Sequence, residues 1–424
     1  MGLIQELTWR GLVHDVTPGT EEQLAKELTS GYIGFDPTAD SLHIGNLVPV
    51  FLLKHLQRAG HKPIVLVGGA TGMVGDPSGK KSERQLLDQQ TLAQNLEGQK
   101  KQLKKFLDFG NEPTSAVMVN NHDWFKEFSF LDFIRDVGKH ISVSYMMAKD
   151  SVKSRLETGM SFTEFTYQLV QGYDFYHLYE NYNCKLQMGG SDQWGNIVTG
   201  TELIRRKSSG QAFALTAPLL TKSDGSKFGK SEGGNIWLDP KRTSPYKFYQ
   251  YWLNVSDIDA ERFIKIFTFL NEPEIQKLIK EHKEAPHLRV LQKKMASNIT
   301  TQVHGDEALD QAIKASQILF GKSTSEDLKA ISKESFLSVF DGVPSGKIKS
   351  TDLSEGIGII DLLVAQTGFL KSNGEATRAL KENSIQVNKQ RVVKEFSLTK
   401  ADLINDEYVL LQRGKKNYFL VEVV

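Results

Sequence analysis

The chain has 424 residues with 52 Lys plus Arg against 51 Asp plus Glu, so no global positive charge indicates a nucleic-acid partner, and any RNA contact must come from a local patch. Its single cysteine, Cys184, excludes an intramolecular disulfide framework and a zinc site of the CxxC type. The length predicts two or three domains, and no stretch approaches the ~20 apolar residues of a membrane span, so we expect a cytoplasmic protein without a membrane partner.

A strand-loop-helix unit is the first informative feature of the chain. The short run 32–35 is followed by the breaker Asp36-Pro37 and by a segment, roughly 44–58, in which apolar residues at three- and four-residue spacing predict one apolar helix face. The apolar run 64–67 that comes next is typical of a strand buried on both faces. Strand, helix and strand predict a right-handed parallel crossover and an α/β fold.

The rest of the chain divides into further segments. A second strand-to-glycine boundary lies at 184–195, where loops of open parallel sheets bind ligands, and a mostly helical insertion at about 81–180 precedes it. The pattern is helical from about 245 to 319. Residues 321–352 are rich in Ser, Lys, Gly and Asp and predict a linker before a small unit of one helix and short strands. We expect a catalytic domain at 1–225, an all-α domain with a lysine loop at 226–320, and a small α+β domain at 353–424.

The segment from Asp36 to Asn46 places a histidine and a glycine at the start of the first predicted helix. Backbone N–H groups there lack intrahelical partners and the helix dipole is positive, so a phosphate is stabilised. Gly45 lets a flat base or ribose approach the backbone, while Thr38, His43 and Asn46 can donate hydrogen bonds. A lone His-x-Gly is more often a helix cap with a surface histidine.

A second motif lies far downstream. Lys227-Phe228-Gly229-Lys230-Ser231 is flanked by glycines, which predict a loop; alone, such a loop is usually a solvated turn. In order and context the two motifs resemble the HIGH and KMSKS signatures of class I aminoacyl-tRNA synthetases. The stretches 34–43, 67–72, 75–78, 189–196 and 243–246 resemble the bacterial tyrosyl enzymes, and this similarity covers essentially the whole chain. The sequence departs from these signatures at Asn46, which replaces the second histidine of HIGH, and at Phe228-Gly229, which replace Met-Ser of KMSKS.

This resemblance implies a Rossmann-like catalytic domain that activates tyrosine with ATP and then transfers the tyrosyl group to tRNA(Tyr). The tyrosine carboxylate attacks the α-phosphate, so the protein aligns the reactants and stabilises charge rather than supplying a base. Magnesium would accompany ATP without a dedicated protein metal site. The resemblance assigns the catalytic roles to Thr38, His43, Lys80, Arg84, Lys227 and Lys230, and ATP binding to Gly34, Asp36, His43, Gly45, Asn46, Gly190, Asp192 and Lys230.

Selecting tyrosine over phenylalanine requires buried partners for the phenolic hydroxyl, because an apolar pocket alone discriminates weakly. The resemblance implies that Tyr32 and Asp174 bind the hydroxyl. It assigns the amino-group end to Asp76, Tyr167, Gln171, Asn121 and Gln193. The spacing of Tyr167, Gln171 and Asp174 places all three on one helix face, which could otherwise be a polar surface stripe. Cys184 is expected in the core, because this chemistry uses no thiol.

The C-terminal unit is modestly basic. Residues 371–424 contain ten Lys plus Arg against seven Asp plus Glu, a net of plus three that a solvated surface would also explain. Several stretches nevertheless resemble the small RNA-binding domain appended to these synthetases. We therefore expect tRNA contact there, with phosphate contacts supplying most of the affinity, through Arg378, Lys381, Arg413, Lys415 and Lys416.

Three other interpretations compete. A tryptophanyl-tRNA synthetase shares the core, but Tyr32 with Asp174 and the C-terminal unit argue against it. An NAD-dependent or P-loop enzyme fails on spacing, because 68–79 contains no GxGxxG and Lys81 stands where the P-loop needs Ser or Thr. A non-catalytic RNA-binding relative would be expected to lack the lysines or the tyrosine pocket. The resemblance also implies a homodimer formed through residues near 130–165.

Overall fold

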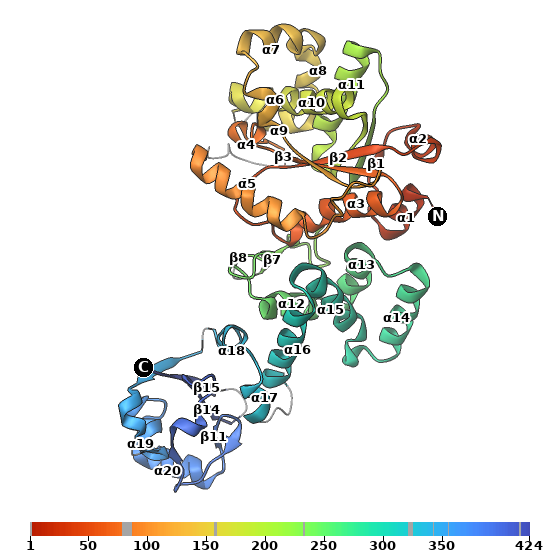
Figure 1. Cartoon of the computed structure of the whole chain (residues 1–424). Helices are drawn as coiled ribbons and strands as arrows, with labels where there is room; N and C mark the ends of the chain where they lie inside the picture. The colour runs from red at the N-terminus through yellow and green to blue at the C-terminus, as the bar shows by residue number, and fades with distance from the viewer. Residues whose placement is uncertain are drawn as a thin grey trace. The chain divides into compact units, whose positions relative to one another are not determined.

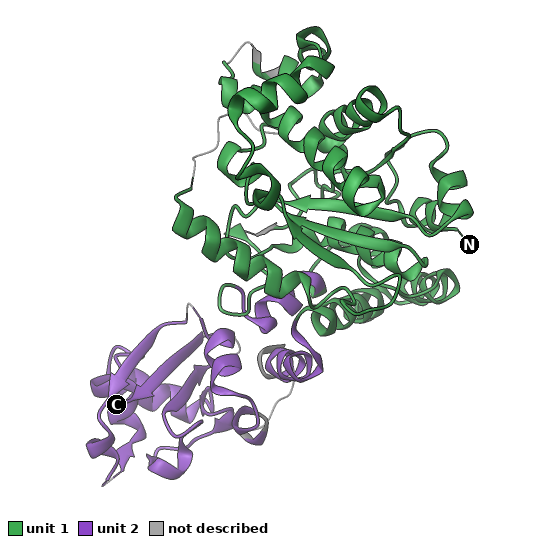
Figure 2. Ribbon diagram, turned by 45° about the horizontal axis from the view of Figure 1, so that its top comes forward, with its two compact units in different colours: residues 1–242, 253–303 green, residues 243–252, 304–424 purple. Residues whose placement is uncertain are grey.

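The computed structural model describes residues 2–78, 87–156, 159–231, 234–320, 325–341, 343–354, 356–414 and 417–424. The chain forms two compact units (Figure 2). Unit 1 comprises residues 1–242 and 253–303, and unit 2 comprises residues 243–252 and 304–424. Within the described residues, no helix is long and apolar enough to cross a membrane.

Unit 1 is built around a six-stranded sheet in the order β1-β6-β5-β2-β3-β4. All neighbouring strands are parallel except β1, which pairs antiparallel with β6 at the edge. The predicted parallel crossover is confirmed, since β2 and β3 pair in parallel on either side of helix α3. The strands are β1 (Asp15–Val16), β2 (Ser30–Phe35), β3 (Lys62–Val67), β4 (Val117–Asn120), β5 (Cys184–Gly190) and β6 (Phe213–Ala217).

Helices cover both faces of this sheet, with α3 and α5 on one side and α10 and α11 on the other (Figure 1). Tyr32, Ile64 and Leu66 pack with Phe175 and Leu178 in one buried cluster, which explains why the strands need apolar residues on both faces. Cys184 is fully buried in the same cluster, as expected. The bounds are α3 (Leu47–Arg58), α5 (Gln89–Leu103), α10 (Phe162–Tyr182) and α11 (Trp194–Ser208).

The predicted insertion is helical for most of its length but also contains β4. This strand pairs with β3 at the edge of the central sheet, so that part of 81–180 belongs to the sheet. Its four residues are too few to show a period in the sequence. The helices of this region are α6 (His122–Phe125), α7 (Phe130–Asp136), α8 (Val143–Met147) and α9 (Asp150–Leu156).

The helical pattern expected from about 245 to 319 is confirmed. Unit 1 contains α13 (Asp257–Phe267), α14 (Glu272–Glu284) and most of α15 (Val290–His304), while unit 2 contains most of α12 (Pro245–Leu253) and α16 (Asp306–Phe320). Side-chain caps begin two of these helices: Ser256 accepts from the Asp259 backbone, and Asn271 and Glu274 form a capping box.

Unit 2 ends in a five-stranded sheet in the order β12-β11-β14-β15-β9. The segment 321–352, interpreted as a linker, contains α17 (Ser325–Lys329), α18 (Lys333–Val339) and β9 (Ser345–Ile348), and β9 pairs in parallel with β15. A linker without regular structure was therefore the wrong interpretation, although the division into domains stays a prediction. The other elements are α20 (Asn373–Lys381), β11 (Ile385–Val387), β12 (Gln390–Arg391), β14 (Tyr408–Arg413) and β15 (Asn417–Val423).

Candidate functional site

The two signature segments lie side by side in unit 1. The Ile44 N–H donates to the Ile236 carbonyl at 2.9 Å, and the Leu238 N–H donates to the Leu42 carbonyl at 2.8 Å, so residues 236–238 run antiparallel to 42–44. The Ile236 N–H in turn donates to the Gly229 carbonyl at 3.1 Å. The two motifs, 184 residues apart from Gly45 to Gly229, are therefore joined through backbone hydrogen bonds.

The His43 segment forms a helix start with defined side-chain roles. His43 precedes the short 3₁₀ turn Ile44–Asn46, its Nδ1 accepts from the Gly45 N–H at 3.0 Å, and its own N–H donates to Asn46 Oδ1 at 3.0 Å. Because Nδ1 accepts, the neutral ring carries its proton on Nε2, which is then a donor suited to a phosphate oxygen. Asn46, at the position of the second signature histidine, closes the turn.

Helix α5 braces the loop that connects β2 to this turn. Asn95 donates to the Pro37 carbonyl at 2.9 Å, Gln99 donates to the Ala39 carbonyl at 3.0 Å, and Gln102 accepts from the Leu42 N–H at 2.8 Å. All three amides are buried on one helix face. Gly98 belongs to that contact: a Cβ there would lie 2.0 Å from the Asp40 carbonyl oxygen, so only glycine allows the approach. Thr38 and Asp40 line an adjoining groove of about 1190 Å³ that also includes Lys101, Lys105 and Arg242.

A buried carboxyl lies at the centre of a cluster of polar side chains. Asp174 on α10 is 1% exposed, and it accepts hydrogen bonds from Asn121 Nδ2 and from Trp124 Nε1, both at 3.0 Å. Asn121 also donates to Thr71 Oγ1 at 3.1 Å and accepts from the Ala70 N–H at 2.7 Å. The loop after β4 and the glycine-rich turn after β3 thus fix one carboxyl group.

Two further carboxylates lie along the same edge of the sheet. Asp36 accepts from Tyr167 Oη at 3.0 Å and from Thr71 Oγ1 at 2.7 Å. Asp76, which is buried, accepts from Gln193 Nε2 at 2.7 Å and from the Ser78 N–H at 2.9 Å. The loops after β2, β3 and β5 supply these groups, which is where ligands bind in open parallel sheets.

Three buried polar atoms in this region have no hydrogen-bond partner among the described residues: Tyr32 Oη, Gln171 Oε1 and Gln187 Oε1. Leaving a buried polar group unpaired costs about 1–3 kcal/mol, so these three atoms are candidates for contact with a polar ligand. Tyr32 and Gln187 are neighbours in the register of β2 and β5. A ligand with a hydroxyl at one end and a charged polar group at the other would satisfy them.

Burial raises the pKa of Asp174 to about 8 and outweighs the hydrogen bonds from Asn121 and Trp124. Burial likewise raises the pKa of Tyr32, and the nearby Asp174 raises it further. Both shifts favour the protonated form of the side chain, because burial penalises the charged form.

We expect this carboxyl to give a distinctive pH dependence of stability. Between its ordinary pKa of 3.8 and about 8, the folded state holds a proton that the unfolded state has lost, so the free energy of unfolding falls as pH rises through that range. Measured by urea unfolding, the free energy of unfolding should fall more between about pH 6 and about pH 9 in the parent chain than in Asp174→Asn. An equal fall in the free energy of unfolding in the two proteins would contradict the raised pKa of Asp174.

Some predicted residues cannot be placed. Lys80, Arg84, Lys415 and Lys416 lie outside the described residues, as does the side chain of Lys230. Lys227, Thr38 and Gly34 are exposed. Gly190 is the last residue of β5, and Asp192 follows the strand and accepts from Gln193 Nε2 at 3.4 Å. In unit 2, Arg378 and Lys381 are exposed on α20, and Arg413 makes an ion pair with Glu375 at 2.5 Å.

Sequence reasoning missed several residues of the pocket. Gln187 is a polar residue inside a buried strand, and this break in an apolar run was the available signal. No comparable sequence signal marked Thr71, Trp124 or Asn196. Each becomes part of the site only through tertiary contacts, with Asp36, Asp174 and Ser78 respectively.

Comparisons with known proteins agree on one family. Residues 25–321 match the family model described as tRNA synthetases class I (W and Y), and residues 335–421 match the tyrosine–tRNA ligase SYY-like C-terminal domain. The chain is 64% identical to the tyrosine–tRNA ligase of Flavobacterium johnsoniae, over 100% of this chain and 99% of the relative. It is 59% identical to that of Bacteroides fragilis, over 99% of each.

Solved structures agree with these matches. The C-terminally truncated mitochondrial tyrosyl-tRNA synthetase of Aspergillus nidulans superposes with a TM-score of 0.68 at 32% identity, covering 75% of this chain and 94% of that one. A tryptophanyl-tRNA synthetase from Encephalitozoon cuniculi superposes with a TM-score of 0.53 at 15% identity, covering 72% and 87%, which indicates a shared fold only.

Proposed function

Because the chain belongs to the class I tRNA synthetases of the tryptophan and tyrosine type, we propose that the pocket around Asp174 is its tyrosine site and the His43 turn its ATP site. Its activity is that of a tyrosine–tRNA ligase, and the tryptophan alternative is not favoured. The overall reaction forms tyrosyl-adenylate and pyrophosphate, then attaches tyrosine to the 3′ end of tRNA(Tyr).

The buried pair Tyr32 and Asp174 is the observation that carries the tyrosine assignment. Both oxygen-bearing groups are enclosed, and the phenol of Tyr32 has no partner among the described residues, so a substrate hydroxyl between them would be hydrogen-bonded on both sides. A site of this kind rejects phenylalanine because the analogue leaves buried polar groups unpaired. Asp76, with Gln193, Tyr167 and Gln171, would receive the ammonium group.

The ATP assignment depends on the joined signature segments. The Nε2 proton of His43, the Thr38 hydroxyl and the backbone N–H groups of the turn would donate to phosphate oxygens, while Lys227 and Lys230 would approach from the adjacent loop. The carboxylate of tyrosine then attacks the α-phosphate and pyrophosphate leaves with both electrons of the broken P–O bond. We assign Lys80 and Arg84 the same role toward pyrophosphate.

Magnesium enters this proposal as the companion of ATP. Within the described residues, no cluster of three or more His, Cys, Asp or Glu side chains could hold a metal ion, so phosphate oxygens would supply its ligands. We propose that Arg378, Lys381, Arg413, Lys415 and Lys416 contact the RNA backbone, and that the protein works in the cytoplasm, where ATP and tRNA are available.

Aminoacylation tests the complete proposal. Purified chain with ATP, tRNA(Tyr) and labelled tyrosine should form acid-precipitable tyrosyl-tRNA, whereas labelled tryptophan or phenylalanine should not. Charging with tryptophan in preference to tyrosine would contradict the pocket assignment.

An exposed apolar surface supports the proposed homodimer. Three helices, α7, α8 and α10, pack on one buried cluster of Val137, Ile141, Met146, Leu169 and Leu203. Their other side chains include large exposed apolar residues, which we call the insertion patch: Phe130, Leu131, Ile134, Val143, Met147 and Phe162, with Leu131 76% exposed. Patches of this kind mark interaction surfaces, and a two-fold interface uses the same patch on both subunits.

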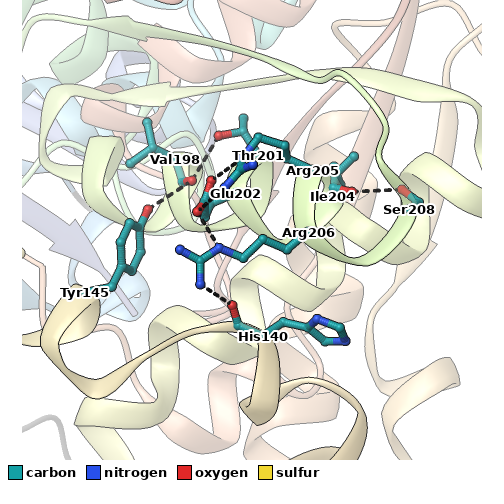
Figure 3. Close-up of polar contacts among 9 residues, drawn as sticks. All are labelled: His140, Tyr145, Val198, Thr201, Glu202, Ile204, Arg205, Arg206 and Ser208. Carbon is teal, nitrogen blue, oxygen red and sulfur yellow. Dashed lines mark hydrogen bonds and ion pairs between the residues drawn. The ribbon is translucent and has the colours of Figure 1, made fainter.

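Hydrogen bonds to α11 hold part of the segment that carries the insertion patch in place. Figure 3 shows that the Tyr145 hydroxyl donates to the Val198 carbonyl and that Arg206 donates to the His140 carbonyl, at 3.2 and 2.8 Å. These bonds tie the segment between α7 and α8, and α8 itself, to α11. Such a preorganised surface loses little conformational entropy when it pairs.

We expect Leu131→Asp to prevent this pairing. Burying an unpaired carboxylate in each half of the interface is costly, so sedimentation should give the mass of one chain for the variant and of two for the parent. Val393→Asp, which changes an apolar residue of unit 2 that is 60% exposed, should stay dimeric. A parent chain that sediments as one copy would contradict the dimer.

A further inference from the structure

The loop that carries Lys227 is a tight hairpin. Thr221 and Lys227 form an antiparallel bridge, the Lys222 N–H donates to the Ser226 carbonyl at 2.9 Å, and Gly225 at the turn has a φ of 80°. These contacts hold the two ends of segment 221–227 together. Its position relative to the His43 turn therefore depends on where the hairpin is attached.

The first attachment is a carboxylate at the start of α13. Asp259, 3% exposed, accepts from the Ser223 N–H at 2.9 Å and from Ser223 Oγ at 3.0 Å. Ser256 Oγ also donates to it, at 2.9 Å, from the N-cap position of the same helix. The Asp259 carboxylate thus links the hairpin entry at Ser223 to Ser256, the N-cap residue of α13.

The second attachment is the ring of Phe228, the residue after Lys227. It stacks on Phe267 with centroids 5.2 Å apart and an interplanar angle of 12°, and it meets Phe263 edge-on at 5.0 Å. Both partners belong to α13 and are fully buried. Ring pairs at these distances add about 0.5–1.5 kcal/mol beyond the apolar area they bury.

Helix α13 is itself held in place. Arg10 of α1 (Leu3–Arg10) donates from Nη1 to the Thr268 carbonyl and from Nη2 to the Leu270 carbonyl, both at 2.7 Å. These carbonyls follow the end of α13, so a buried guanidinium fixes the end of this helix to α1.

The residue after Phe228 touches the ATP-site turn. Gly229 has a φ of 88°, and a Cβ there would be 3.4 Å from the Gly45 backbone nitrogen. We infer that Asp259 and Phe228 are positioning residues for adenylate formation: they seat the hairpin on α13 so that Lys227 and the following residues face the His43 turn. This inference depends on the proposed ATP site. It also explains the Phe228 departure, because the ring fills a site between two buried phenylalanines.

Phe228→Ala tests the inference, with Phe228→Met as a conservative variant and Phe269→Ala as the matched control. Phe269 is likewise half-buried and stacks on Phe51 at 4.8 Å, but its ring contacts lie with α3 rather than the hairpin. We expect tyrosine-dependent pyrophosphate exchange to fall about 10- to 100-fold in kcat for Phe228→Ala, while the Kd for tyrosine stays the same. Trypsin should cut faster after Lys222 and Lys227. Phe228→Met, flexible and apolar, should recover most of the exchange.

Asp259→Asn provides a second, independent test that keeps the side-chain shape. It should also reduce kcat for exchange and leave tyrosine binding unchanged, because a neutral amide replaces the carboxylate that accepts from Ser223 and Ser256 and pairs with Arg262. Unchanged exchange in both Phe228→Ala and Asp259→Asn, or an equal loss in Phe269→Ala, would overturn the inference. Absence of exchange in the parent chain would instead contradict the proposed function.

Discussion

Replacing Asp174 with Asn is expected to lower kcat/KM for tyrosine activation by about 10³-fold or more. The two carboxyl oxygens accept from Asn121 and Trp124, and an amide can accept at only one of these positions, so a buried donor would face another donor. The phenolic hydroxyl of the substrate would also lose a strong acceptor. Steady-state pyrophosphate exchange at varied tyrosine concentration measures this effect.

The same variant should lose selectivity. With the carboxyl replaced, only Tyr32 of the two hydroxyl partners remains, so the ratio of kcat/KM for tyrosine to that for phenylalanine should fall by about 10²-fold or more. Glu180→Gln, an exposed change on the same helix, is the control and should behave like the parent. A variant that keeps full selectivity would mean that the hydroxyl binds elsewhere.

Replacing Gly98 with Ala is expected to impair activation without any contact to substrate. The added Cβ would be 2.0 Å from the Asp40 carbonyl oxygen, a backbone atom that cannot move alone, so the loop carrying Thr38 must shift. A shift of about 1 Å in a positioning loop can cost about 10²-fold in rate. Exchange kinetics at saturating tyrosine should show this loss.

The Tm of Gly98→Ala distinguishes two effects of opposite sign, the steric clash with Asp40 and the higher helix propensity of alanine. Alanine favours a helix interior by roughly 1 kcal/mol over glycine, whereas overpacking costs about 1–3 kcal/mol, so thermal unfolding should show a net decrease. Gln94→Ala on the exposed face of α5 should leave both exchange and Tm nearly unchanged. An increased Tm together with full exchange in Gly98→Ala would disprove the proposed brace.

The local patterns of the sequence predicted the parallel core because its strands and α3 are apolar at regular spacing. The hydrogen bonds from the α5 amide side chains to the loop after β2 were not predictable in the same way. Asn95, Gln99 and Gln102 form a polar stripe at helical spacing, which is typical of a solvated surface, and only the docking of α5 against the β2 loop buries them.

Long-range pairing also explains the error at 321–352. The sequence Ser345–Ile348 has little apolar character, and it becomes a strand because β15 offers it a parallel partner about 75 residues later. The signature segments were easier to predict, since glycine, histidine and lysine at fixed positions have a direct chemical reason. Their contact through Ile44 and Ile236 required the fold.

The most direct test of the central claim is amino-acid-dependent exchange of labelled pyrophosphate into ATP, with tyrosine, phenylalanine and tryptophan compared side by side and Lys230→Ala assayed in parallel. We expect exchange with tyrosine alone, strongly reduced in the lysine variant. Exchange supported equally by tryptophan, or by none of the three amino acids, would contradict it.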